Sequence, residues 1–487
     1  MAASLWSAAG PSGVGFLPSR QHRQSPSCPH AGLRIVMCKA VRAERLIKWA
    51  ELKQHASPTD LWVAVNGKVY DLTAYQKVHP GSSLILQHVG GTDASEAFRA
   101  FRHPPSTSIV MQNYCIGAME SPREGGLPMS PSALQLLQTR AKMEKAGLFR
   151  VDHWNYIILA AGLVVAFAAV LMCVAARWVV PGALLMALFW QQLALVGHDV
   201  GHNQLFTTRS ANSIMGIFVT LFLGAGVQWW KYNHNTHHVT PNSSDHDPDI
   251  QHLPFFALSS RFFKNLYSTF YKATMVFDNA LTKALISIQH YTFLPMMLVA
   301  RFGFYAMTSF HLLARDRPSI YKPFEVAAFL GFFAWYFTLC FCLPTWWERA
   351  LFFAISHAGF GIINLQTTLN HWGRPVEGGS ALAIHDNDWT RTQMMATNNV
   401  SCPEWMDWFH GGLQYQIEHH LYPDLPRHQL RAASGYVKPM CESLGIRYHA
   451  PKFFQAIGEV LGALKVVAMQ AKSLVNEESQ TTPVKAE

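Results

Sequence analysis

Charged residues are scarce in this chain of 487 residues, of which only 14% are Asp, Glu, Lys or Arg. Ordinary soluble proteins have about 25%. Half of the residues are apolar, so the composition argues against a typical soluble domain and indicates a membrane protein. The net charge of +9 fits loops that face anionic lipid headgroups. No basic patch interleaved with aromatic residues is found, so no nucleic-acid partner is expected.

Paired cysteine motifs are also absent. The eight cysteines are scattered and form no CxxC, which argues against a disulfide framework and predicts that the parts outside the membrane face a reducing compartment.

Acidic residues are missing from residues 1–43, which carry five Arg or Lys and no long apolar run. The missing apolar run argues against a secretory signal, whereas a leader that is poor in acids and rich in Ser and Arg is typical of an organelle transit peptide. We therefore interpret residues 1–43 as a plastid transit peptide. The alternatives are a disordered leader, or an upstream extension before a true start at Met37.

Four further segments follow from composition. Residues 44–120 are expected to form a small soluble domain, because two short apolar strands flank the hairpin signal Asn66-Gly67. Residues 121–135 are rich in Gly, Pro and Ser and are expected to be a linker. Residues 136–455 are expected to form the membrane domain, and residues 456–487 a C-terminal tail, polar after Lys472.

Four apolar runs are long enough to cross a bilayer as helices of about 20 residues. They are residues 157–178, 179–197, 325–344 and 346–369. Their short joints predict two hairpins. Two other apolar runs, near 214–230 and 284–313, are interrupted by His, Arg, Pro or Gly and are expected to be interfacial or partly inserted.

Four spans place the N-terminal domain, residues 198–283 and everything after residue 370 on one side of the membrane. Lys and Arg are frequent in these segments and nearly absent from the hairpin joints. The positive-inside rule therefore predicts that this side is cytosolic or stromal.

Histidine is concentrated on that side in three clusters. They are HDVGH, with His198 and His202; HNTHH, with His234, His237 and His238; and QIEHH, with Gln416, His419 and His420. Positions i, i+3 and i+4 share one face of a helix, so each cluster can direct its imidazoles to one point. Neutral imidazole suits iron, zinc, copper or nickel. Seven histidines exceed the needs of one tetrahedral site, so two metal ions are expected. Nearby acids could hold the distal ring nitrogens: Asp199, Asp245, Asp247 and Glu418.

These clusters resemble the three histidine boxes of membrane fatty-acyl desaturases, together with DPDI (247–250) and MDWFHGGLQYQIEHHLYPDLPRHQLR (406–431). The third box opens with Gln416 where many desaturases have His, which is typical of front-end desaturases. The resemblance spans roughly residues 58–450. It implies an all-α integral membrane domain with a cytosolic or stromal helical cap, two non-haem irons and O2 as co-substrate. It also implies that His371 in LNHWG is a ligand and that Gln416 ligates weakly or holds a metal-bound water.

The soluble domain resembles cytochrome b5, a small α+β haem domain. HPGS begins at His79, and His103 lies 24 residues later in FRHPPS. The resemblance implies that His79 and His103 bind haem b axially. The family usually has a second Gly where this chain has Ser82, and Ser tolerates positive φ less well. His88, between the two ligands, is expected to be a surface helix residue.

The combined resemblance implies a front-end desaturase that inserts a cis double bond between an existing double bond and the carboxyl end of a lipid-linked polyunsaturated acyl chain. A cytochrome b5 reductase or ferredoxin would supply electrons to the haem domain. The type would be Δ4, Δ5 or Δ6. The leader resembles that of green-algal plastid Δ4 enzymes, which favours Δ4 on plastid lipids and a chloroplast membrane with the site facing the stroma.

Other readings remain open. One is a sphingolipid long-chain-base Δ8 desaturase of the endoplasmic reticulum membrane, facing the cytosol. A lipid hydroxylase would use the same oxidant. A histidine-rich metal transporter with a haem sensor would need polar residues within its spans, and the first three runs have almost none. Zinc could replace iron.

Overall fold

The computed structural model describes residues 45–101, 103–104, 106–121, 130–314, 319–379 and 388–481. All of them belong to one compact unit. The expected leader, residues 1–43, lies outside the described residues.

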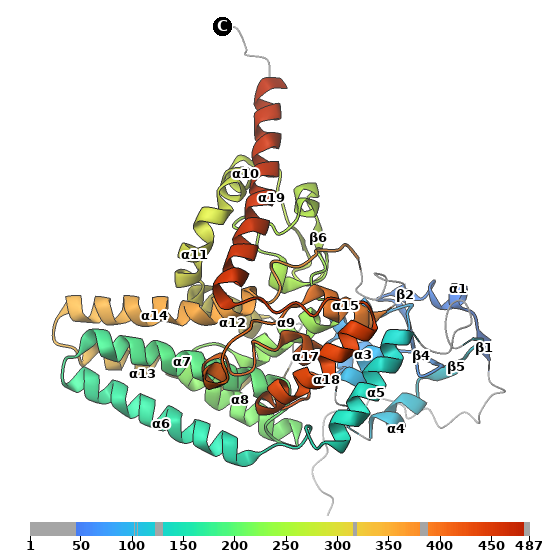
Figure 1. Cartoon of the computed structure of the whole chain (residues 1–487), viewed down its shortest axis with the longest axis horizontal. Coiled ribbons are helices and arrows are strands. Elements are labelled where there is room, and N and C mark those ends of the chain that lie inside the picture. Colours follow the sequence, from blue (N-terminus) through green and yellow to red (C-terminus); the bar gives the residue numbers. More distant parts are fainter. Residues whose placement is uncertain are drawn as a thin grey trace, which may run out of the picture. The chain divides into compact units, whose positions relative to one another are not determined.

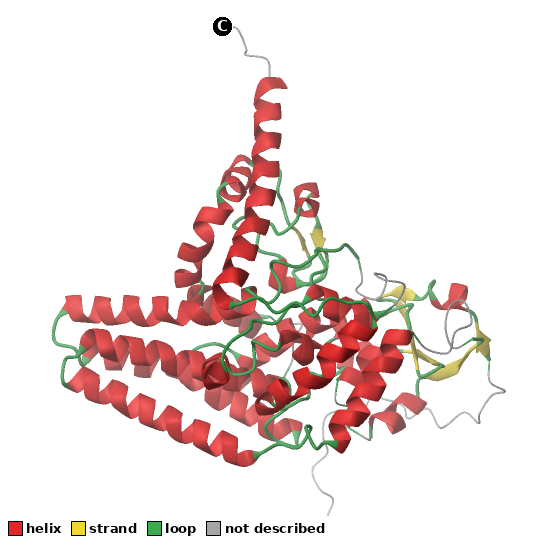
Figure 2. Cartoon of the chain, viewed as in Figure 1, coloured by secondary structure: helices red, strands yellow, loops and turns green. Residues whose placement is uncertain are grey.

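An α+β domain at the N-terminus is built on a five-stranded sheet with strand order β1-β5-β4-β3-β2. Its strands are yellow in Figure 2. The strands are β1 (Leu46–Ile47), β2 (Ala56–Ser57), β3 (Asp60–Val65), β4 (Lys68–Asp71) and β5 (Cys115–Met119). The predicted hairpin is confirmed: β3 and β4 are antiparallel, and Asn66 and Gly67 both have positive φ between them, as a tight hairpin turn requires. The helices are α1 (Trp49–Leu52), α2 (Ser83–His88), α3 (Ser95–Ala100) and α4 (Thr107–Gln112).

The second domain is helical, and the two predicted hairpins are present (Figure 1). They are α6 (His153–Ala175) with α7 (Val179–Gly201), and α13 (Lys322–Phe341) with α14 (Trp346–Thr368). Large aromatic side chains fill the space between them, among them Trp190, Phe332, Phe352 and Phe360, each at most 1% exposed.

Five helices are long and apolar enough to cross a membrane, or up to seven if each bent pair of helices counts as one span. The additional helix is α19 (Phe453–Thr481), which occupies the range expected to be a C-terminal tail. The four expected spans do not include α19, because polar residues interrupt its apolar stretch, although its mean hydropathy equals that of α14.

Two bent helix pairs account for the interrupted apolar runs. Helices α8 (Arg209–Leu223) and α9 (Val227–Val239) meet at 111°, and α11 (Gln289–Val299) and α12 (Arg301–Leu313) meet at 68°. Gly224 ends α8 with φ +73°, and a Cβ there would lie 2.4 Å from the Phe332 ring, so the bend requires glycine.

The remaining shorter helices are together called the cap. They are α5 (Pro131–Lys145), α10 (Ala280–Ser287), α15 (Trp389–Ala396), α16 (Asp407–His410), α17 (Gln416–Leu421) and α18 (Leu430–Ser443), with a small hairpin of β6 (Tyr267–Ser268) and β7 (Ala273–Thr274). The second histidine cluster lies on α9 and the third on α17.

The two domains share one buried apolar cluster, which joins Leu86 and Ala97 of the α+β domain to Ile417 and Tyr422 of the cap. Polar contacts add to it. Glu96 on α3 accepts hydrogen bonds from the backbone N–H of Thr390 at 2.9 Å and from its hydroxyl at 2.6 Å.

The expectation that His88 is a surface residue is wrong. Its residue is only 6% exposed, because the helical domain covers this face of α2. The Nε2 atom of His88 lies 3.0 Å from the Thr269 hydroxyl, and its ring lies 4.6 Å from that of His246. His88 is therefore part of the contact between the domains.

The contact at Glu96 predicts a pH dependence of stability. Burial raises the pKa of Glu96 from 4.5 to about 6, so the folded chain retains a proton that the unfolded chain releases. The free energy of unfolding should therefore fall by roughly 1–2 kcal/mol as pH rises from 4.5 to 6. Glu96→Gln should flatten this slope in thermal melts of the full chain. Glu144→Gln, at an exposed site, is the matched control. An unchanged slope in Glu96→Gln would show that the raised pKa of Glu96 does not cause the pH dependence.

Candidate metal centre

Three elements and one turn bring the histidine clusters together. His198 and His202 lie at the end of α7, and the next three cluster histidines lie on α9. His419 and His420 lie on α17, and His371 lies three residues beyond α14. All of them except His198 are at most 8% exposed. Helical spacing therefore places the imidazoles as the sequence predicts.

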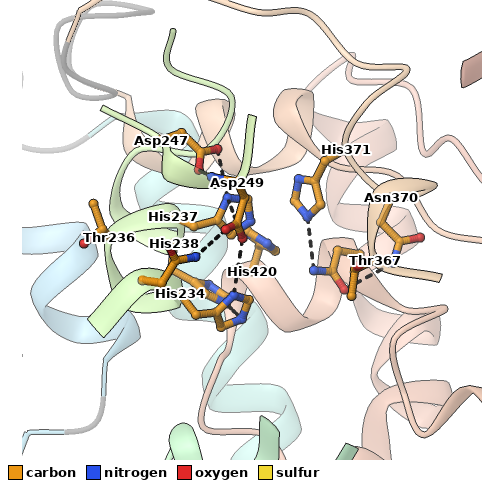
Figure 3. Close-up of polar contacts among 12 residues, drawn as sticks. His234, Thr236, His237, His238, Asp247, Asp249, Thr367, Asn370, His371 and His420 are labelled. Atoms are coloured by element: carbon orange, nitrogen blue, oxygen red, sulfur yellow. Dashed lines mark hydrogen bonds and ion pairs between the residues drawn. The ribbon is translucent and has the colours of Figure 1, made fainter. Parts of the chain in front are cut away.

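The imidazoles form two groups in which all candidate ligand atoms lie within 4.8 Å of one another. The first group is His198, His202, His234 and His419; the second is His237, His371 and His420. His238 lies between them: its Nε2 is 3.0 Å from that of His234 and 3.1 Å from that of His419, and its ring stacks on His420 at 4.1 Å. Figure 3 shows this gathering of side chains from α9 and the C-terminal segments.

The donor set fits metal ions. Nε2 atoms of His198, His202 and His420 are buried without a hydrogen-bond partner among the described residues. Ring nitrogens that face one another cannot all be satisfied by shared protons, because a neutral imidazole carries one N–H. Burial without compensation would cost free energy at each nitrogen. Two metal ions, one per group, would remove this cost.

Side chains outside the two groups orient the rings. Asp247 is fully buried, and its carboxylate accepts from His237 Nδ1 at 2.9 Å. The Gln393 side-chain oxygen lies 2.8 Å from His420 Nδ1. Each contact leaves Nε2 of its histidine to face the centre, as is usual for metal-binding histidines.

The other acids considered from the sequence contribute less. Asp199 lies 3.8 Å from His198. Glu418 is bonded to Asn399 and Tyr448. Asp245 accepts from the backbone of Gly379. Among the described residues, neither Glu418 nor Asp245 forms a hydrogen bond with a ring of the two groups.

Gln416 lies beside the second group, with its side-chain amide 3.1 Å from His371 Nε2. The amide is a poorer metal ligand than imidazole, so Gln416 adds only a weak, neutral donor beside this group.

Sequence reasoning did not identify three neighbours of the centre. Asp249 lies 3.8 Å from ring nitrogens of both His234 and His237, and the Trp230 ring stacks on His234 at 4.2 Å. Asp249 and Trp230 are near HNTHH in sequence, and the DPDI motif contained the signal for Asp249. Gln393 is far from every cluster and has no local signal.

The candidate haem site lies in the α+β domain. Nδ1 of His79 donates to the Ser82 carbonyl at 3.1 Å, and Nδ1 of His103 donates to the Phe98 and Phe101 carbonyls at 3.0 and 2.9 Å. Both Nε2 atoms therefore keep a lone pair for iron. Burial lowers the pKa of His79 to about 4 and also lowers that of His103, so both rings are neutral, as axial ligation requires.

Ser82 has φ +101° in the turn that presents His79, which confirms the expected strain of a non-glycine residue there. The Ser82 carbonyl still accepts the His79 bond, so the turn keeps its function of orienting this ring.

Phe101 connects the two candidate cofactor sites. Its carbonyl accepts from His103, and its ring lies 6.3 Å from the His238 ring in an edge-to-face arrangement. One side chain therefore separates a predicted haem ligand from the metal centre.

A cavity of about 80 Å³ adjoins the first group at His198. Its walls are mainly apolar and include Leu195, Val227, Phe304, Phe360 and Ile363. A reactive centre beside an apolar cavity suits a hydrocarbon ligand.

Comparisons with known proteins agree with this geometry. Residues 175–452 match the family model described as fatty acid desaturase, and residues 48–120 match the cytochrome b5-like heme/steroid binding domain. The chain is 36% identical over 442 residues to the acyl-lipid (9-3)-desaturase of Borago officinalis, covering 89% of this chain and 96% of the relative.

Two further relatives are named as delta 8 desaturases. The chain is 35% identical over 438 residues to delta(8)-fatty-acid desaturase 2 of Arabidopsis thaliana, covering 89% and 95% of the two chains. It is 36% identical over 343 residues to a delta 8-(E)-sphingolipid desaturase of Lachancea kluyveri, covering 68% of this chain and 59% of the relative.

Removal of the Asp247 charge should weaken the metal centre. We expect Asp247→Asn to lower metal affinity by about tenfold to hundredfold, because it weakens the bond that orients His237. Bound iron, measured against a competing chelator, gives the affinity. Asp245→Asn is the matched control, since Asp245 lies nearby and holds a backbone amide instead. Equal iron retention by Asp247→Asn and the wild type would contradict this role.

The assignment of His79 and His103 as haem ligands predicts a change in the absorption spectrum when either is replaced. His79→Ala and His103→Ala should each lose the absorption spectrum of a bis-histidine b-type haem. Ser82→Gly should keep the spectrum and raise the melting temperature, because it relieves a strain of roughly 1–3 kcal/mol. A normal spectrum in His79→Ala would show that another residue ligates the haem.

Proposed function

The chain belongs to the fatty acid desaturase family, with a cytochrome b5-like domain fused to its N-terminal side, and on this basis we propose that it is a front-end desaturase of a lipid-linked chain. The proposed reaction converts –CH2–CH2–, O2, two electrons and two protons into a cis –CH=CH– and two waters.

The observation that carries the proposal is the contact between the first histidine group and the apolar cavity at His198. A saturated segment offers only C–H groups, so its recognition depends on shape and apolar contact. The cavity of about 80 Å³ is smaller than a complete ligand pocket of roughly 300–1,000 Å³. It therefore suits the few carbons nearest the reaction.

When bound, two metal ions at the histidine groups would supply oxygen activation, and a haem held by His79 and His103 would supply electron transfer. The chain's own residues hold and orient these groups. Asp247 and Gln393 keep a proton on Nδ1 of His237 and His420. Phe304 and Phe360 line the cavity and exclude water from it. We propose His371 as a ligand of the second group, with Gln416 beside it.

The fused haem domain is the proposed immediate electron donor, supported by the position of Phe101 between His103 and His238. An external cytochrome b5 reductase or ferredoxin would reduce the haem.

The proposed topology has α6, α7, α13 and α14 crossing the membrane, with all three histidine boxes on one side. The Lys and Arg distribution supports this arrangement. A further span by α19 would leave the boxes where they are, because α19 follows all of them in the sequence. It would change only the side on which the C-terminus lies.

The proposed substrate is a polyunsaturated acyl chain of a glycerolipid, with the new bond on the carboxyl side of an existing one. Only the composition of residues 1–43 supports Δ4 on a plastid lipid and a chloroplast location. A second candidate is a sphingolipid long-chain base, which the names of relatives such as the Lachancea enzyme favour.

Expression in a yeast host with defined lipids tests both candidates. Mass spectrometry should locate a new double bond in glycerolipid acyl chains, whereas a new bond only in long-chain bases would favour the second candidate. The double variant His237→Ala/His238→Ala should lose all product and the non-haem iron of the second group. His153→Ala, at an exposed histidine of α6, should keep both. A hydroxylated product, or full activity in the double variant, would overturn the proposal.

A further inference from the structure

A second and larger cavity of about 500 Å³ lies beside α6, α7 and the segment before the third histidine box. Its size is within the range of ligand sites. It has no lining residue in common with the cavity at His198. Helix α7 contributes Leu188, Phe189 and Gln192 to the second cavity, but Ala194, Leu195 and His198 to the first.

One end of the second cavity is apolar and belongs to the membrane part of the fold. Leu159, Leu163, Ala166 and Phe189 line it. Ile158 also lines it and is 58% exposed, so the cavity reaches the outer surface of α6. Only 17% of the apolar window of α6 is buried, which makes this surface a face toward lipid.

The other end is polar and carries balanced charge. Arg427 pairs with Asp199 at 2.5 Å, and Arg431 pairs with Asp407 at 2.6 Å through both Nε and Nη2. Two guanidinium groups are therefore matched by two carboxylates. An anionic headgroup would have to compete with these existing ion pairs, so net charge gives it little advantage.

Three polar atoms at this end, Nη2 of Arg427, Oε1 of Gln414 and Nδ1 of His428, have no partner among the described residues. Nη2 of Arg427 is a buried donor, and Oε1 of Gln414 is a buried acceptor on a residue only 2% exposed. Buried polar groups are normally hydrogen-bonded. A hydroxyl group can accept from the first and donate to the second, because it has both capacities.

We propose that this cavity binds a lipid whose headgroup is uncharged and bears hydroxyls, at a site separate from the catalytic cavity. The hydroxyls contact Arg427 and Gln414, and an acyl chain follows the groove between α6 and α7. The inference does not depend on the proposed reaction. The site is nevertheless linked to the metal centre through an ion pair, because Arg427 binds Asp199, which follows His198 in the sequence.

Gly162 offers a direct test. It lines the cavity, and a Cβ there would meet no atom within 4 Å, so Gly162→Phe places a ring against the apolar groove without a backbone clash. Gln414→Leu removes the unpartnered acceptor at similar volume, together with the 2.9 Å hydrogen bond that the Gln414 amide donates to Asp407, so its melting temperature is compared with that of the wild type. Gly462→Phe on α19 is the matched control, because Gly462 is also an exposed helical glycine with open space around its Cβ.

The experiment uses the purified full chain with haem and iron, and native mass spectrometry to count retained lipids. The probes are dioleoyl forms of monogalactosyldiacylglycerol, phosphatidylcholine and phosphatidylglycerol. We expect the wild type and Gly462→Phe to retain the galactolipid preferentially. Gly162→Phe and Gln414→Leu should retain about tenfold less, through lost apolar burial in the first and a lost hydrogen bond in the second.

Equal retention of the three lipids by the wild type would refute the headgroup class, as would a preference for phosphatidylglycerol. Undiminished galactolipid retention in Gly162→Phe would refute the site, because a lipid held in the catalytic cavity would be unaffected there. Binding is measured without turnover, so an inactive protein that still binds the galactolipid would count against the proposed function alone.

Discussion

The close approach of buried imidazoles is the constraint on which the rest of this structure depends. Eight rings place their nitrogens within a few ångströms of one another, with few hydrogen bonds to satisfy them. Such an arrangement is unfavourable unless ions occupy it. The bend at Gly224, the turn after α14 and the position of α17 all serve to hold rings from distant parts of the chain at this point. Arg301 supports the bend: it is buried, stacks on Trp190 at 3.7 Å and donates to the last carbonyl of α8 at 2.6 Å.

The cytochrome b5-like domain packs against the helical domain that holds this centre, so the two domains are joined by contacts as well as by the chain. Glu96, His88 and Phe101 each contact a different part of the helical domain, and apolar residues from both domains form one cluster. Four histidines of the two candidate cofactor sites share one local geometry: Nδ1 of His79, His103, His237 and His420 is held by a carbonyl, carboxylate or amide oxygen, and Nε2 is left for metal.

Much of the site was predictable from the sequence because its signals are local. Helical spacing places His198 with His202, and His234 with His238, whatever the tertiary structure. The Asn66-Gly67 turn and the strain at Ser82 are likewise properties of a few adjacent residues. Long-range effects were not predictable. The burial of His88 depends on a partner 181 residues away, and the role of Gln393 depends on helix α15 meeting α17. The apolar stretch of α19 is interrupted by polar residues, which concealed it as a candidate span.

The shared apolar cluster of the two domains has a consequence for how such a fusion works. A carrier that diffuses on a tether delivers electrons at a rate set by linker length and local concentration. Here the haem domain is instead packed as a fixed neighbour, so proximity is built in and encounter is not a separate event. The face of this domain that carries Leu86 and Ala97 is therefore occupied by the helical domain, and a redox partner would have to use another face.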